Sequence, residues 1–148
     1  MNKRMIVLMA FLFSASLAEA QEYRAATVDV TANADQELNK LGQQGWTYIG
    51  LGANRLIFRK TGGSISYTTA TIDVMANADQ ELNKLGQQGW TYIGLGANRL
   101  IFRKTGGNIT YKAVTVDVAA NVEQEINKLG QQGWTYVGLG ANHLIFRK

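Results

Sequence analysis

The feature that most constrains the fold is a tandem repeat with a period of 44 residues. Residues 32–63 and 76–107 are identical, and both read ANADQELNKLGQQGWTYIGLGANRLIFRKTGG. A third copy differs from them conservatively. A fixed period of this size is typical of chains that build one small unit several times and stack the units. We therefore divide the chain into repeats at residues 21–66, 67–110 and 111–148.

Each repeat predicts three strands. Residues 23–30 alternate between apolar and polar side chains, which is typical of a strand with one buried face. Residues 46–51 and 56–60 are rich in aromatic and branched side chains and predict two more strands. The Gly-Ala-Asn sequence at 52–54 between them favours a hairpin turn.

The segment between the first two strands predicts a helix. Asn33 is a suitable cap, with Gln36 three residues later as its capping-box partner. Leu38 and Leu41 lie on one stripe of that helix. Gly45 is the expected left-handed stop, with Gly42 as the alternative.

The predicted fold class is therefore α+β, with three tandem strand–helix–strand–strand repeats. Each repeat is expected to form a small three-stranded antiparallel or mixed sheet covered by one helix. If the first strand pairs antiparallel with the third, the third strand lies in the middle and the helix makes a right-handed crossover. The predicted core comprises the large apolar residues of the helix and the hairpin: Leu38, Leu41, Trp46, Trp90, Trp134, Phe58, Phe102 and Phe146.

The first twenty residues have the pattern of a secretory signal peptide. A short basic start at residues 1–4 precedes an apolar run at 5–13 and a small-x-small site at 18–20. The apolar run is too short to span a bilayer as a stable helix. We expect cleavage between Ala20 and Gln21, a periplasmic or secreted location, and no transmembrane anchor afterwards. The chain has no Cys, so an exported fold would depend on packing without disulfides.

The repeats also resemble a known family. Residues 38–46 read Leu-Asn-Lys-Leu-Gly-Gln-Gln-Gly-Trp, and the pattern recurs at 82–90 and 126–134. With the closing strand Leu-Ile-Phe-Arg-Lys at 56–60, it is similar to the small bacterial domains of domain-of-unknown-function family 4177. This resemblance implies the fold of each repeat and carries no activity, because the function of that family is itself unassigned.

A unit of 44 residues is small for an independent fold. Even a domain of about 60 residues buries only about 60% of the surface that its unfolded chain exposes. We therefore expect the copies to share a core, either as self-contained units packed together or by exchanging strands. In the exchanged form, residues 56–60 would pair with 66–74 of the next copy, and residues 23–30 would close a ring on 144–148. Near-identical neighbours also favour homo-oligomers.

The sequence contains no catalytic constellation. It has no nucleophile elbow, no phosphate-binding loop and no metal-binding His/Glu helix, so we expect no enzyme, no cofactor and no metal. The single His, His143, stands where the other copies have Arg55 and Arg99, and we interpret it as a surface substitution. The formal net charge of +4 is too mild to favour a nucleic-acid partner.

The aromatic hairpin is the better candidate for binding. A tyrosine face can stack on a sugar ring while neighbouring amides bond its hydroxyls. Arginines of the hairpin could contact an acidic polymer, or they could protect a sheet edge from aggregation. The candidate binding residues are Tyr48, Tyr92, Tyr136, Asn54, Asn98, Asn142, Arg55 and Arg99.

Two functions follow from these observations as hypotheses. The first is a secreted or periplasmic non-catalytic binding module, with three equivalent copies that contact an envelope glycan or a protein partner with avidity. The second is a structural envelope protein that self-associates through strand edges or swapped repeats, since the hairpin has high strand propensity and no proline.

Overall fold

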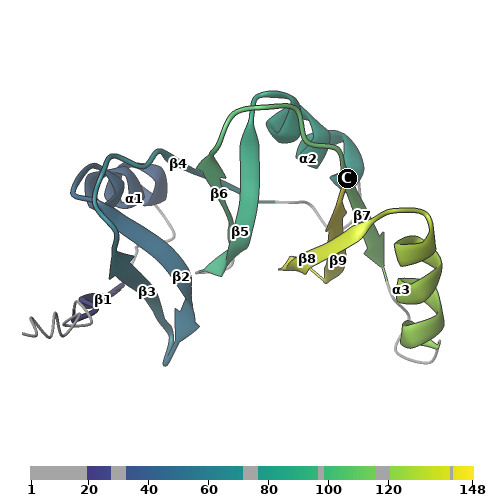
Figure 1. Ribbon diagram of the computed structural model, residues 1–148, viewed down its shortest axis with the longest axis horizontal. Coiled ribbons are helices and arrows are strands. Elements are labelled where there is room, and N and C mark those ends of the chain that lie inside the picture. The colour runs from purple at the N-terminus through teal and green to yellow at the C-terminus, as the bar shows by residue number, and fades with distance from the viewer. Residues whose placement is uncertain (1–19, 28–32, 72–76, 97–98, 116–120, 141) are drawn as a thin grey trace, which may run out of the picture.

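The computed structural model describes residues 20–27, 33–71, 77–96, 99–115, 121–140 and 142–148 (Figure 1). Every copy forms one strand, one helix and a two-stranded hairpin, in that order. The elements of the first copy are β1 (Tyr23–Ala26), α1 (Ala34–Gln43), β2 (Trp46–Gly52) and β3 (Arg55–Lys60). Those of the second are β4 (Tyr67–Ala70), α2 (Ala78–Gln87), β5 (Trp90–Gly96) and β6 (Arg99–Lys104). Those of the third are β7 (Tyr111–Thr115), α3 (Val122–Gln131), β8 (Thr135–Gly140) and β9 (His143–Arg147).

The strands form three separate three-stranded antiparallel sheets, one in each copy. Their orders are β1-β3-β2, β4-β6-β5 and β7-β9-β8, so the third strand of each copy lies in the middle as predicted. The predicted α+β class is confirmed. The exchanged form is excluded for the described strands, because β3 pairs with β1 and β2, and β9 pairs with β7 and β8.

The hairpin turn follows from local backbone chemistry. Ala53 and Asn54 have φ angles of 48° and 59°. Two consecutive left-handed residues make the tight turn whose twist matches that of the flanking strands. Gly52 belongs to β2, one residue beyond the predicted end of that strand, and a register shift between Tyr48 and Gly50 bends the strand.

The helices begin and end close to the predicted residues. Gly45 follows α1 with a φ of 82°, which is the expected left-handed stop. The predicted cap by Asn33 is wrong, because its side chain makes no capping hydrogen bond. Asn77 is in the left-handed region, where the usual extended cap geometry is lost. Only Asn121 forms the cap among these three residues, by accepting a hydrogen bond from the Gln124 amide.

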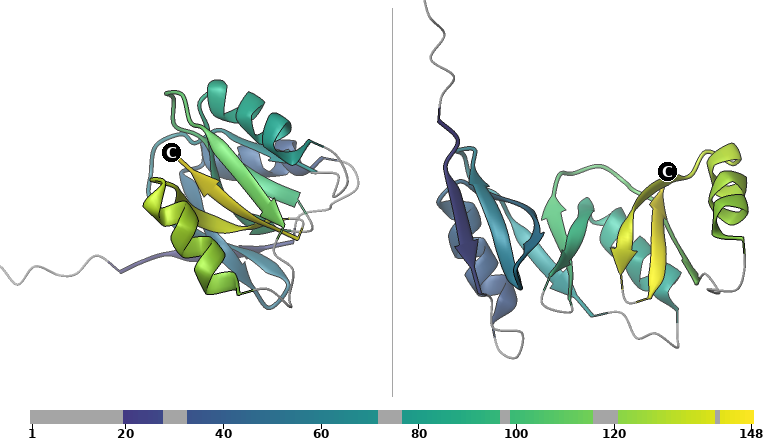
Figure 2. Two further views of the ribbon diagram at one scale, coloured as in Figure 1. Left: turned by 90° about the vertical axis from the view of Figure 1, so that its right-hand side faces the viewer. Right: turned by 90° about the horizontal axis from the view of Figure 1, so that it is seen from below.

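The three copies follow one another along the long axis of the molecule (Figures 1 and 2). β1 lies at one end and α3 at the other. Seen along that axis, the helices take different positions around the sheets, so each copy is rotated relative to the one before. No helix in the described ranges has the length and apolar character needed to cross a membrane.

The hydrophobic core crosses the boundaries between copies. One cluster joins Leu38, Tyr48 and Phe58 of the first copy to Tyr67 and Ile101 of the second. Leu41 and Trp46 pack against this cluster and are partly buried. A second cluster joins the second copy to the third, and its members are Leu82, Tyr92, Leu100, Phe102, Tyr111 and Ile145. The copies therefore keep their own sheets and share their cores.

Candidate functional site

The first strand of a following copy packs against the preceding copy, and a tyrosine at the start of that strand makes the main contact. The Tyr67 hydroxyl donates a hydrogen bond to the Trp46 carbonyl at 2.9 Å and accepts one from the Tyr48 amide at 2.8 Å. Trp46 and Tyr48 lie in β2, an edge strand of the first sheet. Tyr67 therefore satisfies polar backbone groups at that edge, while its ring is 2% exposed.

The helix of the first copy binds the free edge of β4 in return. The Asn39 side chain donates to the Tyr67 carbonyl at 2.9 Å and accepts from the Tyr67 amide at 2.8 Å. The Asp35 carboxylate accepts a hydrogen bond from the Thr69 amide at 2.7 Å. A helix that covers an edge in this way removes unpaired backbone groups from solvent.

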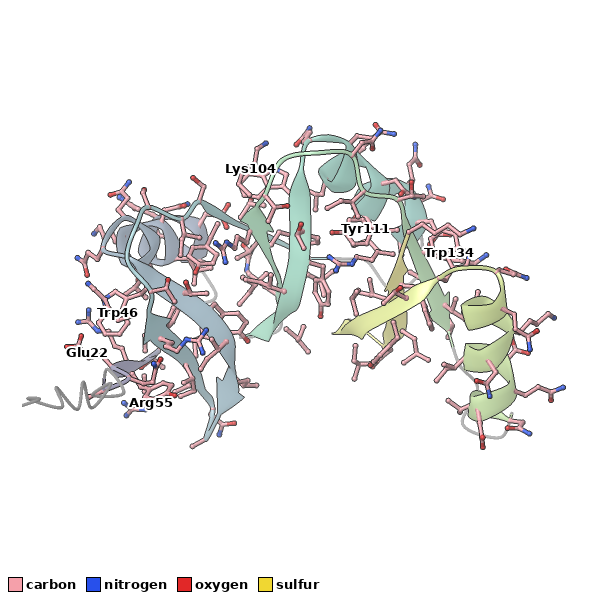
Figure 3. The ribbon with its side chains drawn as sticks, in the orientation of Figure 1. Glu22, Trp46, Arg55, Lys104, Tyr111 and Trp134 are labelled. Atoms are coloured by element: carbon pink, nitrogen blue, oxygen red, sulfur yellow. The ribbon has the colours of Figure 1, made fainter. Side chains whose placement is uncertain are left out.

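The boundary between the second and third copies repeats this arrangement. The Tyr111 hydroxyl donates to the Trp90 carbonyl at 2.8 Å and accepts from the Tyr92 amide at 2.8 Å. The Asn83 side chain holds both backbone groups of Tyr111, and the Asp79 carboxylate accepts from the Ala113 amide. Figure 3 shows Tyr111 in the middle of the molecule.

A glycine in each of the first two helices allows this close approach. A Cβ on Gly42 would lie 2.0 Å from the Ile65 carbonyl oxygen, and one on Gly86 would lie 1.9 Å from that of Ile109. The two Ile residues also donate their amides to these glycine carbonyls. Any side chain at either glycine would collide with the backbone segment that leads into the first strand of the following copy.

The sheets also stack on one another through a second tyrosine. The Tyr48 hydroxyl donates to the Leu95 carbonyl at 2.9 Å, and a Cβ on Gly94 would lie 3.0 Å from the Tyr48 ring. Tyr92 stands in the same relation to the third copy, with its hydroxyl 2.6 Å from the Leu139 carbonyl and its ring over Gly138. Two contacts, a docked strand and a stacked ring, therefore define the repeat interface.

Both halves of this interface are open at the ends of the molecule. Tyr23 corresponds to Tyr67 and Tyr111, yet it is 60% exposed. Gly50 corresponds to Gly94, and a Cβ there would meet no described atom within 4 Å. We call Tyr23, Arg24, Ala25, Gly50 and Ile57 the leading end.

The third copy presents the opposite half. Tyr136 corresponds to Tyr48 and Tyr92, yet it is 47% exposed, against 4% for each of those two. A Cβ on Gly130 would meet no described atom within 4 Å beyond its own helix. A hollow of about 630 Å³ lies along α3, lined by Asn121, Glu123, Gln124, Asn127, Lys128 and Gln131. We call Glu123, Asn127, Gly130 and Tyr136 the trailing end.

The structure corrects the proposed role of two tyrosines. Tyr48 and Tyr92 are buried between copies and their hydroxyls are hydrogen-bonded there, so neither presents a face on which a sugar could stack. Tyr136 is exposed, and its ring meets Phe146 edge-on with the centroids 5.5 Å apart. The three copies are therefore not equivalent at this position.

The other predicted hairpin residues do not form one common surface. Asn54 and Arg55 are exposed, Arg99 is partly buried near Thr69, and Asn142 is exposed. Asn98 lies outside the described residues. The expectation of a surface position for His143 is wrong: it is 7% exposed, and it lines a hollow together with Asp79 and Ala113 of the neighbouring elements.

The predicted core tryptophans are partly buried and carry cations on their outer faces. The Lys60, Lys104 and Lys148 ammonium groups lie 5.0, 4.9 and 4.8 Å from the ring centroids of Trp46, Trp90 and Trp134. Leu38 is 1% exposed, and Phe58, Phe102 and Phe146 are 0–1% exposed. Figure 3 shows Trp46 near one end of the molecule and Trp134 near the other.

Burial of the interface tyrosines raises their pKa values above 10.0, the ordinary value of the phenol. Desolvation is the largest cause in each of Tyr48, Tyr67, Tyr92 and Tyr111. For Tyr92 the neighbouring Tyr48 and Tyr136 add to it. For Tyr67 and Tyr111, burial outweighs the opposing effects of a backbone hydrogen bond and an arginine.

These shifts predict alkaline unfolding. Above about pH 10 the unfolded tyrosines lose their protons while the folded ones keep them, so the unfolded state binds fewer protons and stability falls as pH rises. The contribution of these groups is complete below that pH. We expect phenolate absorbance of the four buried tyrosines to rise only as the far-ultraviolet circular dichroism signal is lost. Full phenolate absorbance with unchanged circular dichroism would contradict the burial of these rings.

The chain matches no family model, no curated protein and no solved structure. The resemblance to domain-of-unknown-function family 4177 therefore stays a hypothesis. Among the described residues, no group of three or more His, Cys, Asp or Glu side chains could hold a metal ion. The open ends of the repeat interface are exposed surfaces whose counterparts elsewhere in the chain bind a neighbouring copy.

Proposed function

We propose that the protein is a secreted or periplasmic, non-catalytic binding module that recognises a protein partner through the trailing end. The partner supplies an extended strand with an aromatic residue, which lies between α3 and the edge strand β8. Recognition by strand addition is a general mode in which backbone hydrogen bonds give affinity and side-chain pockets give specificity.

The observation that supports this proposal is that the same surface binds a strand elsewhere in the chain. α1 holds β4, and α2 holds β7, through an Asn, an acidic residue and a buried Tyr. α3 has Asn127 and Glu123 at the corresponding positions, and both are exposed. We propose a protein strand as the occupant, and no glycan, because Tyr48 and Tyr92, the counterparts of Tyr136, are covered by the following copy and bind its backbone.

A peptide with the sequence of residues 64–71, Ser-Ile-Ser-Tyr-Thr-Thr-Ala-Thr, tests the proposal. This segment contains the strand that α1 binds within the chain. We expect the labelled peptide to bind the protein in a fluorescence anisotropy titration. The same peptide with Tyr67→Ala should bind at least about tenfold more weakly, which corresponds to about 1.4 kcal/mol.

Gly130→Ala is the matched variant of the protein itself, and it should block the surface to which the peptide binds. Its methyl group would occupy the space through which the peptide backbone passes, as the Gly42 and Gly86 contacts show for the other helices. The variant should keep its helix content and lose peptide binding. Equal binding of both peptides, or unchanged binding by Gly130→Ala, would overturn the proposed site.

A further inference from the structure

We propose that the partner is a second copy of this chain, bound head to tail. The leading end of one molecule occupies the trailing end of another, so that the stack of repeats continues across the junction between chains. This inference rests on the proposed function and names its partner.

The docked strand provides the first match. β1 opens with Tyr23, as β4 and β7 open with Tyr67 and Tyr111. In the same register on α3, the Tyr23 hydroxyl would reach the Trp134 carbonyl and the Tyr136 amide. Its backbone groups would meet the exposed Asn127 side chain. The leading strand already has the pairing that the internal interfaces use, because β1 pairs with β3 as β4 pairs with β6.

The stacked ring provides a second match, independent of the first. Tyr136 of one chain would lie over Gly50 of the next, as Tyr48 lies over Gly94 and Tyr92 over Gly138. Ile57 would be covered at the same time. Its counterparts Ile101 and Ile145 belong to the clusters that join copies and are 0–1% exposed.

Charge provides a third match. Arg24 occupies the position of Thr68, whose hydroxyl donates a hydrogen bond to Asp35 at 3.2 Å. Glu123 occupies the position of Asp35 in the third copy. The Arg24 guanidinium lies 5.8 Å from the ring centroid of Trp46, and its counterpart Lys112 lies 5.7 Å from that of Trp134. Arg24 and Glu123 therefore give the two surfaces opposite charges, which assists encounter without requiring an ion pair.

The ends cannot satisfy each other within one chain in this structure, because β1 and α3 lie at opposite ends of the molecule (Figure 2). The contact between chains joins two different surfaces, so it is heterologous. Such contacts form closed rings if the rotation between subunits closes, and open filaments if it does not. The assembly has a direction, with every chain oriented alike.

Two variants block opposite halves of this contact. Tyr23→Ala removes the docking ring from the leading end, and Gly130→Ala fills the path of the incoming strand on the trailing end. Both positions are exposed in the single chain, so both variants should fold. Light scattering coupled to size exclusion over a concentration series should show wild-type oligomers. Each variant alone should need at least about tenfold more protein to associate.

Mixing the two variants gives the decisive result. Tyr23→Ala keeps an intact trailing end and Gly130→Ala keeps an intact leading end, so together they should form a one-to-one heterodimer and no larger species. A wild-type chain that stays monomeric throughout would overturn this inference, as would variants that assemble like wild type or a mixture that stays monomeric. If the 64–71 peptide binds while the chain stays monomeric, the proposed function survives and the second copy is not the partner.

Discussion

Tyr111→Ala is expected to destabilise the protein by about 3–5 kcal/mol, the range for removing a buried aromatic ring from a core. The ring is 2% exposed and meets Phe102 edge-on at a centroid distance of 6.3 Å. Its loss would also leave the Trp90 carbonyl and the Tyr92 amide without the hydroxyl that they bind. Unsatisfied buried groups of this kind cost about 1–3 kcal/mol each.

Tyr23→Ala is the matched control, because it removes the corresponding ring from a copy in which it is exposed. We expect a change within about 0.5 kcal/mol, as for other surface substitutions. Urea denaturation followed by tryptophan fluorescence, at a protein concentration where the chain is monomeric, measures both variants. Similar losses of stability in the two would contradict the claim that Tyr111 joins neighbouring copies.

Gly86→Ala is expected to destabilise the protein by about 1–3 kcal/mol or more, although alanine is normally favoured in helices. The reason is steric, since the new methyl group would lie 1.9 Å from the Ile109 carbonyl oxygen. The segment that leads into β7 would have to move away from α2 to make room for this methyl group.

Gly130→Ala should change the free energy of unfolding in the opposite direction and stabilise the monomeric chain. α3 has no neighbour at Gly130 among the described residues, so only helix propensity acts, and it favours alanine by about 1 kcal/mol. The two variants differ only in which helix carries the change. Thermal unfolding of both by circular dichroism tests the account, and a stabilising Gly86→Ala would show that the strand of the third copy does not approach α2 closely.

The secondary structure could be predicted because its signals are local. The apolar alternation of the strands, the Gly45 stop and the Ala53–Asn54 turn each depend on residues close in sequence. The strand order could be predicted only on the condition that the first strand pairs antiparallel with the third, and the structure shows that pairing. The capping of α1 could not be predicted in the same way, because one φ and ψ pair at Asn33 decides whether its side chain reaches the helix.

The site could not be predicted because identical residues have different surroundings in different copies. Tyr23, Tyr67 and Tyr111 begin the same motif, yet the first is exposed and the other two fill the core of the preceding copy. Tyr48 has the same local sequence as Tyr136 except at one neighbour, and only Tyr48 is buried. Position within the stack, which no local pattern encodes, decides which surfaces are open.

One signal in the sequence did point to the interface. Gly42, Gly86 and Gly130 lie inside predicted helices, where glycine is about 1 kcal/mol less favourable than alanine. A glycine kept in a helix at every repeat indicates close approach of another backbone. In two of the three helices the structure shows that backbone, and in the third the space is open.

Hydrogen–deuterium exchange of the intact chain tests most directly whether each copy completes the one before it. The amides of Tyr67 and Tyr111 are bound by Asn39 and Asn83, whereas the corresponding part of β1 has no preceding copy within the described residues. Because β1 also pairs with β3, only the amides that face away from the sheet report on the preceding copy. At a concentration where the chain is monomeric, we expect strong protection of these amides in segments 67–70 and 111–115, where the preceding helix binds them, and rapid exchange of the corresponding amides in segment 23–26. Equal exchange in all three segments would contradict the account.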